Sequence, residues 1–246
     1  YFLNVAAILK TDEPLLKAGY KVAYEQFKLQ AANVQVPQKA TDAVSYKSKG
    51  DVISVTGKEF EVTFDQKTGT LTTFDFKNKK LVESGPEVNF WRAPVDNDYG
   101  AGTQKRYKAW KDAGKSEKVT TAVKQLSKSE VQISFTRDLF GGDAKLIETF
   151  IVDGNGAVKV TNELKALKGK HPDFFKFGNK LVLPEAYKNI TFYGKGPFEA
   201  YADRQHAAKV GLYKQTIAEQ YFPYIRPQET GNKLEVRWVT LTKEDG

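Results

Sequence analysis

The chain has 246 residues and a formal net charge of +8, with 40% hydrophobic and 13% aromatic residues, a composition that excludes intrinsic disorder. A chain of this length buries roughly 70–75% of its unfolded surface, so it has room for one large domain or two small ones. It contains no Cys, which excludes a disulfide scaffold, thiolate metal sites and a cysteine nucleophile.

The N-terminal residues predict two strands, residues 2–9 and 20–29, joined by a turn around Asp12-Glu13-Pro14. Because two strands cannot form an independent core, we expect them to be the end of a β-domain whose remainder is missing from this chain. The chain contains no Met, so Tyr1 is not a natural start, and we expect a piece of a longer polypeptide. Residues 31–50 contain Pro37 and little periodicity, which is typical of an extended connector.

Alternating apolar and polar residues predict strands over most of the remaining chain. The clearest pattern is a hairpin over residues 59–76, and further strands are predicted at 131–135, 146–151, 158–160 and 234–238. One helix is predicted over about residues 103–113, with Thr103 as its N-cap, Gly114 at its end, and Tyr107 and Trp110 on its buried side. Many short strands separated by turns predict an all-β sandwich.

The first chemically rich cluster is FWRAPVDNDYG at residues 90–100. Two carboxylates flanking an amide could bind a cation or accept sugar hydroxyls. The alternative is an Asx-turn network in which Arg92 pairs with a carboxylate. No Glu stands at the twelfth position of a calcium loop, which excludes an EF-hand.

Two further clusters follow late in the chain. YGKGPFEAYADR at residues 193–204 contains Gly-x-Gly, but Pro197 and Glu199 exclude a dinucleotide fingerprint. YFPYIRPQETGN at residues 221–232 predicts a rigid aromatic loop, which is either a wall of a sugar site or a buried corner in which Glu229 pairs with Arg226 or Arg204.

The three clusters in this order resemble the C-terminal β-domain of the large bacterial β-galactosidases of glycoside hydrolase family 2. The matching patterns are FWRAPxDNDxG, YGxGPxExYxDR and YxRPQExGN followed by VRW. LNV at residues 3–5 and AGYKVAYEQFKL at 18–29 are similar to the end of the immunoglobulin-like domain that precedes it in those enzymes. The resemblance covers essentially the whole chain.

The resemblance implies a galactose-mutarotase-like β-supersandwich at residues 50–246, incomplete at its C-terminus. Residues 1–36 would be the terminal strands of an immunoglobulin-like sandwich and 37–49 a linker. It also implies a parent enzyme that hydrolyses terminal β-D-galactosides such as lactose with retention, using two glutamates on a TIM barrel with magnesium and sodium. No (β/α)₈ pattern is present, so we expect this chain to hold neither glutamate and no cofactor, and to be inactive alone.

Family knowledge implies that the segment after the DND motif lies beside the active-site mouth. We therefore expect a substrate-proximal loop formed by Asp96, Asn97, Asp98, Tyr99, Gly100, Ala101, Gly102 and Thr103, in which two glycines ease a hinge motion; a plain Gly-rich loop is the alternative. The other family-motif positions are interpreted as structural: Trp91, Arg92, Tyr193, Gly194, Gly196, Pro197, Glu199, Tyr201, Asp203, Arg204, Tyr224, Pro227, Gln228, Glu229, Gly231 and Asn232.

Fold kinship leaves a second hypothesis, a stand-alone carbohydrate-binding or sugar-epimerising module. An epimerase needs an acid and a base, and neither His171 nor His206 lies in a mutarotase-like motif. The basic residues are scattered among acids, which argues against a nucleic-acid partner, and no apolar run approaches the ~18–20 residues that cross a membrane. The expected partners are the remaining domains of the parent, a galactoside, and further copies in a homo-oligomer. The sequence assigns no compartment.

Overall fold

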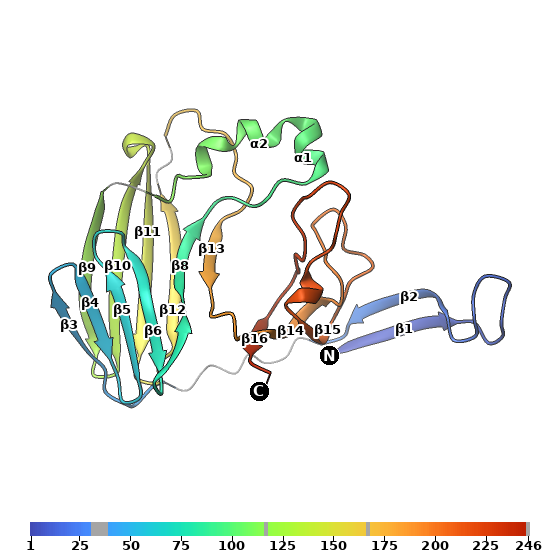
Figure 1. The fold of residues 1–246 in the computed structure, drawn as a ribbon, viewed down its shortest axis with the longest axis horizontal. Coiled ribbons are helices and arrows are strands. Elements are labelled where there is room, and N and C mark those ends of the chain that lie inside the picture. The colour runs from blue at the N-terminus through green and yellow to red at the C-terminus, as the bar shows by residue number, and fades with distance from the viewer. Residues whose placement is uncertain (31–38, 116–117, 166–167, 245–246) are drawn as a thin grey trace.

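Two antiparallel sheets pack face to face around the main hydrophobic core (Figure 1). The computed structural model describes residues 1–30, 39–115, 118–165 and 168–244. One sheet has the order β3(Ser45–Lys49), β4(Val52–Thr56), β5(Phe60–Asp65), β6(Thr70–Phe76), β7(Lys79–Val82). The other has the order β12(Val158–Lys165), β11(Ala144–Asp153), β10(Glu130–Leu139), β9(Val119–Ser127). The all-β prediction and the hairpin over residues 59–76 are confirmed.

The core forms because the alternating apolar residues of the two sheets face each other. Phe60, Val62 and Phe64 of β5 are buried and lie opposite the equally buried apolar residues of β10 and β11. The ring centroid of Phe64 lies 6.1 Å from that of Phe135 and 5.2 Å from that of Phe150. Each such side chain contributes about 1.5–3 kcal/mol by leaving water, so this interface dominates the stability of the sandwich.

A buried ion pair between β10 and β11 lies against the other sheet at the β5–β6 turn. Arg137 Nε lies 2.6 Å from Glu148 Oε2, and the two side chains are 4% and 1% exposed. Arg137 also donates to the carbonyl oxygens of Thr68 and Gly69, at 2.6 and 2.7 Å, in the turn between β5 and β6. Burial raises the pKa of Glu148, although the charge of Arg137 opposes that shift. The guanidinium therefore links one sheet to the turn of the other.

Smaller elements surround the sandwich. Strand β8(Ser84–Asn89) pairs with β13(Gly178–Val182), and β14(Asn189–Gly196) lies between β15(Lys209–Thr216) and β16(Trp238–Thr242). The helical pieces are short: α1(Asp96–Ala101), α2(Thr103–Arg106), and the 3₁₀ turns η1(Lys108–Trp110), η2(Phe140–Gly142) and η3(Ala218–Gln220). A second core cluster contains Phe90 and Trp110. None of the helices in the described ranges is long and apolar enough to cross a membrane.

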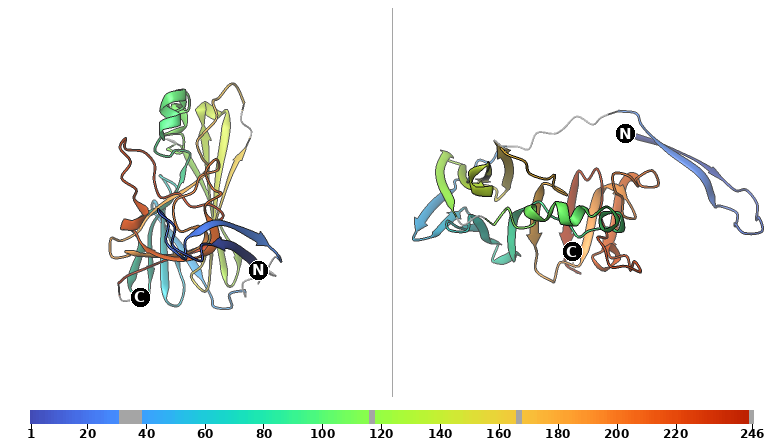
Figure 2. Two further views of the ribbon diagram at one scale, coloured as in Figure 1. Left: turned by 90° about the vertical axis from the view of Figure 1, so that its right-hand side faces the viewer. Right: turned by 90° about the horizontal axis from the view of Figure 1, so that it is seen from above.

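The N-terminal hairpin of β1(Phe2–Ile8) and β2(Lys21–Lys28) extends away from the sandwich (Figure 2). Its side chains are mostly exposed, and it contacts the outer edge of β15 through polar groups. The Gln26 carboxamide donates to Val210 O at 2.8 Å and accepts from Val210 N at 2.9 Å. Glu25 pairs with Lys209 at 3.1 Å. A side-chain amide thus satisfies the backbone groups that an edge strand leaves open.

Three predicted boundaries differ from the structure. Residues 45–49, predicted as part of the linker, form β3, and linker residues 37–38 lie outside the described residues. The helix predicted over residues 103–113 is shorter than predicted: α2 covers Thr103–Arg106 and the 3₁₀ turn η1 follows it, with Gly102 and not Thr103 as the N-cap. The separate helix α1, which begins at Asp96, was not predicted. The strand predicted at residues 234–238 begins only at Trp238, since Glu235 has a φ of 49°. The division into domains stays a prediction.

Candidate functional site

The three sequence clusters meet in one polar pocket of about 350 Å³, which we call the motif pocket. Helix α1 contributes one wall, and the segments after β14 and before β16 contribute the other (Figure 1). The lining residues are Arg92, Val95, Asp96, Asn97, Asp98, Tyr201, Asp203, Arg204, Tyr224, Gln228 and Glu229. Residues 92–98 and residues 201–229, which lie about a hundred positions apart in the sequence, therefore line one pocket.

Arg92 is the central cation of the motif pocket. Its Nη1 donates to Asp98 Oδ2 at 2.6 Å and to Ala93 O at 2.9 Å, and its Nε lies 3.3 Å from Glu229 Oε2. The guanidinium rests over the ring of Phe175, 4.5 Å from its centroid. The interpretation that Arg92 pairs with a carboxylate of the DND motif is confirmed. Within the described ranges no group of three or more His, Cys, Asp or Glu residues could hold a metal ion.

The start of α1 is held from both sides. The buried Asp98 carboxylate accepts the Val95 N–H at 2.8 Å, which satisfies a backbone donor at the helix N-terminus. The Asp96 N–H donates to Gln228 Oε1 at 3.0 Å, and Asp96 Oδ1 lies 3.2 Å from Arg226 Nη1. Arg226 also lies over the ring of Tyr99, 5.2 Å from its centroid. The first and third clusters are thereby connected through α1.

Glu199 connects the second and third clusters. Its Oε1 accepts hydrogen bonds from Tyr224 Oη and Arg204 Nη2, and its Oε2 accepts the Gly231 N–H at 2.9 Å. Asn232 Nδ2 donates to Ala200 O at 2.6 Å beside this contact. Glu199 therefore holds the segment after β14 against the loop at residues 224–231.

The partner predicted for Glu229 is wrong. Glu229 lies against Arg92, whereas Arg204 pairs with Glu199 and Arg226 pairs with Asp96. The predicted partners belong to the second and third clusters, whereas the actual partner, Arg92, belongs to the first cluster. Phe175, the platform beneath Arg92, was also missed, although the aromatic run at residues 174–177 could have indicated it.

Glu229, which lines the motif pocket, and Glu199, which accepts hydrogen bonds from the lining residues Arg204 and Tyr224, have pKa values shifted in opposite directions. Burial raises the pKa of Glu229, and its Oε2 accepts no hydrogen bond from the described residues even though Arg92 lies close enough for a charge interaction. Burial also acts on Glu199, but hydrogen bonds from Tyr224, Gly231 and Arg204 outweigh it and lower its pKa. Burial, together with the charges of Glu199 and Glu229, raises the pKa of Tyr201 to about 12.

These shifts predict opposite pH dependences for two isosteric variants. The stabilisation from ionised Glu199 is present above pH 4.5, its unperturbed pKa, and is lost as the pH falls through the lower folded value. The Glu199→Gln variant should therefore lose stability relative to the parent chain as the pH rises toward 4.5. Protonated Glu229 stabilises the fold below pH 4.5, and this stabilisation is lost as the pH rises through its raised folded value. Glu229→Gln should gain relative stability over that rise.

Urea unfolding from pH 3 to pH 7 in steps of about one unit measures both free-energy differences. Parallel pH profiles for the two variants would contradict the opposite shifts. The Glu13→Gln variant, which changes an exposed carboxyl outside the motif pocket, is the control.

The predicted substrate-proximal loop is mostly helical. Asp96, Asn97, Asp98, Tyr99, Gly100 and Ala101 form α1, and Thr103 begins α2. Gly102 joins the two helices with a φ of 68°, a conformation that an L side chain rarely adopts. One residue therefore provides the backbone freedom predicted for this segment.

The remaining predicted positions lie around this frame. The Tyr193 ring lies 6.4 Å from the Trp238 ring, centroid to centroid, and the Arg237 guanidinium lies over it. A Cβ on Gly194 would meet Val236 Cα at 2.9 Å, and a Cβ on Gly196 would meet the Phe192 and Tyr213 rings. His171 lies 2.8 Å from Asp143 and stacks on Phe140, away from the motif pocket residues, and His206 is exposed.

The family model and the curated relatives that match the chain all carry the name β-galactosidase. Residues 56–246 match the family model described as β-galactosidase small chain. The chain is 34% identical over its whole length to a β-galactosidase of Priestia megaterium, covering 24% of that protein. It is 29% identical over 98% of its length to a β-galactosidase of Streptococcus thermophilus, covering 23% of that protein. It is also 32% identical over 99% of its length to a β-galactosidase of Lactobacillus delbrueckii subsp. bulgaricus. The chain spans about a quarter of the length of the curated relatives it matches.

Proposed function

The chain belongs to the β-galactosidase small-chain family, and from this premise we propose that it is the non-catalytic β-region of a retaining β-galactosidase of glycoside hydrolase family 2. The parent enzyme hydrolyses terminal β-D-galactosides such as lactose. The part of the enzyme outside this chain supplies the acid/base and the nucleophile.

The pairing of the carboxylates in the motif pocket supports a non-catalytic role. A retaining glycosidase needs two carboxyls about 5–5.5 Å apart, one of which exchanges a proton while the other attacks the sugar. Here Asp98 and Glu229 share Arg92, Glu199 accepts three hydrogen bonds, and Asp96 pairs with Arg226. Each of these carboxylates already contacts cationic or hydrogen-bonding groups of the protein, so a substrate would have to displace protein contacts to use them.

The observation that carries the proposed role is the way in which α1 is held. Arg92, Gln228 and Arg226 fix its first turn against the third cluster, while Gly102 leaves its C-terminal end joined to α2 by one permissive residue. We assign to residues 96–103 the wall of the active-site mouth, which adjusts about Gly102 when a galactoside binds.

The proposal assigns magnesium and sodium to the rest of the enzyme.

A hybrid enzyme tests the proposal. The chain replaces the corresponding quarter of the Priestia megaterium β-galactosidase, and turnover of a chromogenic galactoside is compared with that of the chain alone and of the relative without this quarter. We expect turnover by the hybrid only. Hydrolysis by the purified chain would contradict the non-catalytic assignment, and a folded but inactive hybrid would contradict membership of the working enzyme.

A further inference from the structure

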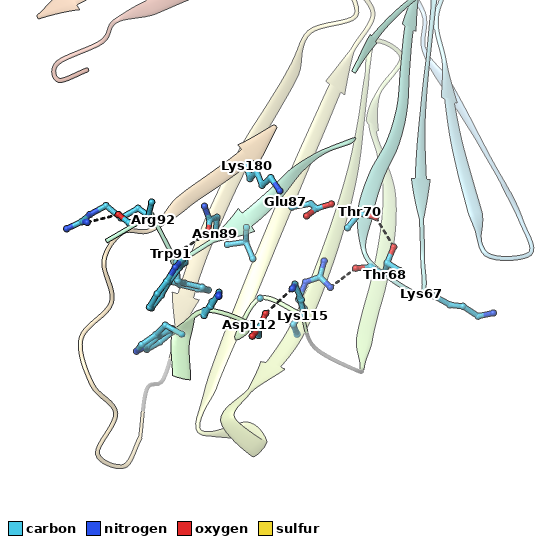
Figure 3. A pocket seen from close by; sticks show the side chains of 17 residues that line it. Lys67, Thr68, Thr70, Glu87, Asn89, Trp91, Arg92, Asp112, Lys115 and Lys180 are labelled. Carbon is cyan, nitrogen blue, oxygen red and sulfur yellow. Dashed lines mark hydrogen bonds and ion pairs between the residues drawn. The ribbon is translucent and has the colours of Figure 1, made fainter. Parts of the chain in front are cut away.

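A second and larger cavity, of about 700 Å³, lies beside the sandwich and is not used by the proposed function (Figure 3). It is bounded by β8, β13, the turn at residues 67–70 and the segment 110–115. Figure 3 shows Asn89 beside Trp91, and Glu87 from β8 and Lys180 from β13 line the same cavity. We call this cavity the Trp91 groove and define it by Glu87, Asn89, Trp91, Lys111 and Lys180. Its volume lies within the roughly 300–1,000 Å³ typical of small-molecule sites.

The aromatic surface of the groove is already oriented. The Trp91 ring is half-buried and packs edge-on against Phe175, with ring centroids 4.8 Å apart and planes at 70°. The Trp91 N–H donates to Asn89 Oδ1 at 2.9 Å, which fixes the backbone and leaves the Asn89 amino group facing the same cavity. Because the ring is already held in place, little conformational entropy of the protein would be lost when a ligand stacks on this indole.

The two tryptophans that line this groove, Trp91 and Trp110, differ in whether the indole N–H has a hydrogen-bond acceptor. The Trp110 ring is buried, and its Nε1 donates to Pro172 O at 2.6 Å, so its hydrogen-bonding capacity is used inside the fold. Among the described residues the Trp91 indole N–H has no hydrogen-bond acceptor. A half-buried tryptophan with a free donor is suited to a ligand that offers both a ring face and hydroxyl oxygens.

The charges around the groove indicate a neutral ligand. Four of its cations are neutralised by partners: Lys115 by Asp112 at 2.9 Å, Lys67 by Asp51 at 2.8 Å, Arg137 by Glu148, and Arg92 by Asp98 and Glu229. Among the described residues Lys180 has no ion-pair partner within 4 Å, the Lys111 ammonium lies over the Trp91 ring, 5.8 Å from its centroid, and Glu87 interacts electrostatically with Lys115. The groove therefore presents both ammonium groups and a carboxylate. Such a mixture of donors and an acceptor matches hydroxyl groups, which donate and accept at the same atom.

We propose that the Trp91 groove binds a neutral saccharide. One face of a sugar ring stacks on Trp91, and the hydroxyls bond to Asn89, Glu87, Lys111 and Lys180. This binding requires only the chain itself and involves no bond cleavage, so it is distinct from the proposed function, although Arg92 borders both cavities.

Titration of the chain with lactose, methyl β-D-galactoside and cellobiose, followed by saturation-transfer NMR and calorimetry, tests the proposal. We expect saturable binding, weakened about tenfold or more by Trp91→Ala and restored in part by Trp91→Phe. Trp238→Ala, which removes a tryptophan exposed on β16, is the matched control and should leave the affinity unchanged. Because Trp91 packs on Phe175, the exposed pair Lys111→Ala and Lys180→Ala provides a second test that does not disturb the core.

Three results would overturn the proposal. The first is the absence of saturation up to the solubility limit of the sugars. The second is equal affinity in the Trp91→Ala, Trp238→Ala and unsubstituted chains. The third is tighter, salt-sensitive binding of galactose 6-phosphate, since that would assign the groove to anions. Turnover of the hybrid enzyme is a separate measurement, so failure of this site leaves the proposed function standing and failure of the hybrid leaves this site standing.

Discussion

Replacing Arg137 by Met should lower the free energy of unfolding by about 3–5 kcal/mol, because it leaves a buried carboxylate without its partner. Glu148 is 1% exposed and would keep its charge at neutral pH only at a high desolvation cost. The variant also removes the donors to Thr68 O and Gly69 O, so the β5–β6 turn loses its link to the second sheet. Urea unfolding at neutral pH measures the difference.

Two companion variants identify the cause. Arg137→Met combined with Glu148→Leu should recover most of the loss, since no unpaired charge remains in the core. Arg106→Met removes an exposed arginine of α2 and should change the unfolding free energy by less than about 0.5 kcal/mol. If the Arg137 variant unfolds at the same urea concentration as the parent chain, the ion pair does not stabilise the fold.

Replacing Arg92 by Met should lower kcat/KM of the hybrid enzyme on the order of 10²-fold, the effect expected when a wall of an active site moves by about an ångström. The variant separates Asp98 and Glu229 from their shared cation, so the N-terminal end of α1 loses its anchor. Arg92→Lys should lower kcat/KM less than Arg92→Met, because it keeps the positive charge. Some loss should remain, because an ammonium lacks the planar fork that contacts both carboxylates.

Arg237→Met is the control for this loss. Arg237 pairs with Glu235 and lies over Tyr193, outside the lining of the motif pocket, and its removal should leave kcat/KM within about twofold. Far-ultraviolet circular dichroism at the assay temperature separates a shift of α1 from unfolding. Full activity of a folded Arg92 variant would show that the contacts of Arg92 with Asp98 and Glu229 do not position the active site.

The strands of the sandwich could be predicted because their side chains are sorted by burial. β5 and β10 alternate buried and exposed positions, which is the pattern that the sequence analysis used. β3 was missed because it is an edge strand with every side chain exposed, so its sequence shows no apolar period. The helix prediction failed at Gly100 and Gly102, which interrupt helical periodicity although backbone and side-chain contacts still hold α1.

The site could be predicted only as separate motifs. The sequence identified Arg92, Glu199 and Glu229 as family positions. The structure places Arg92 and Glu229 in one pocket and Glu199 against two other residues that line it. The pairing of Arg92 with Glu229 depends on how α1 docks against the segment before β16, which no local pattern encodes. Phe175 was missed for the same reason, since its contact with Arg92 is formed only in the folded chain.

The proximity of α1 to bound galactoside is the central claim, and thiol labelling tests it most directly. The chain contains no Cys, so Tyr99→Cys in the hybrid creates one thiol in this region at a position 40% exposed here, and peptide mass locates the label. Leu15→Cys on the N-terminal hairpin, 95% exposed, is the control. We predict that a saturating non-hydrolysable thiogalactoside slows labelling at position 99 and leaves position 15 unaffected. An unchanged labelling rate at position 99 in an active hybrid would contradict the account.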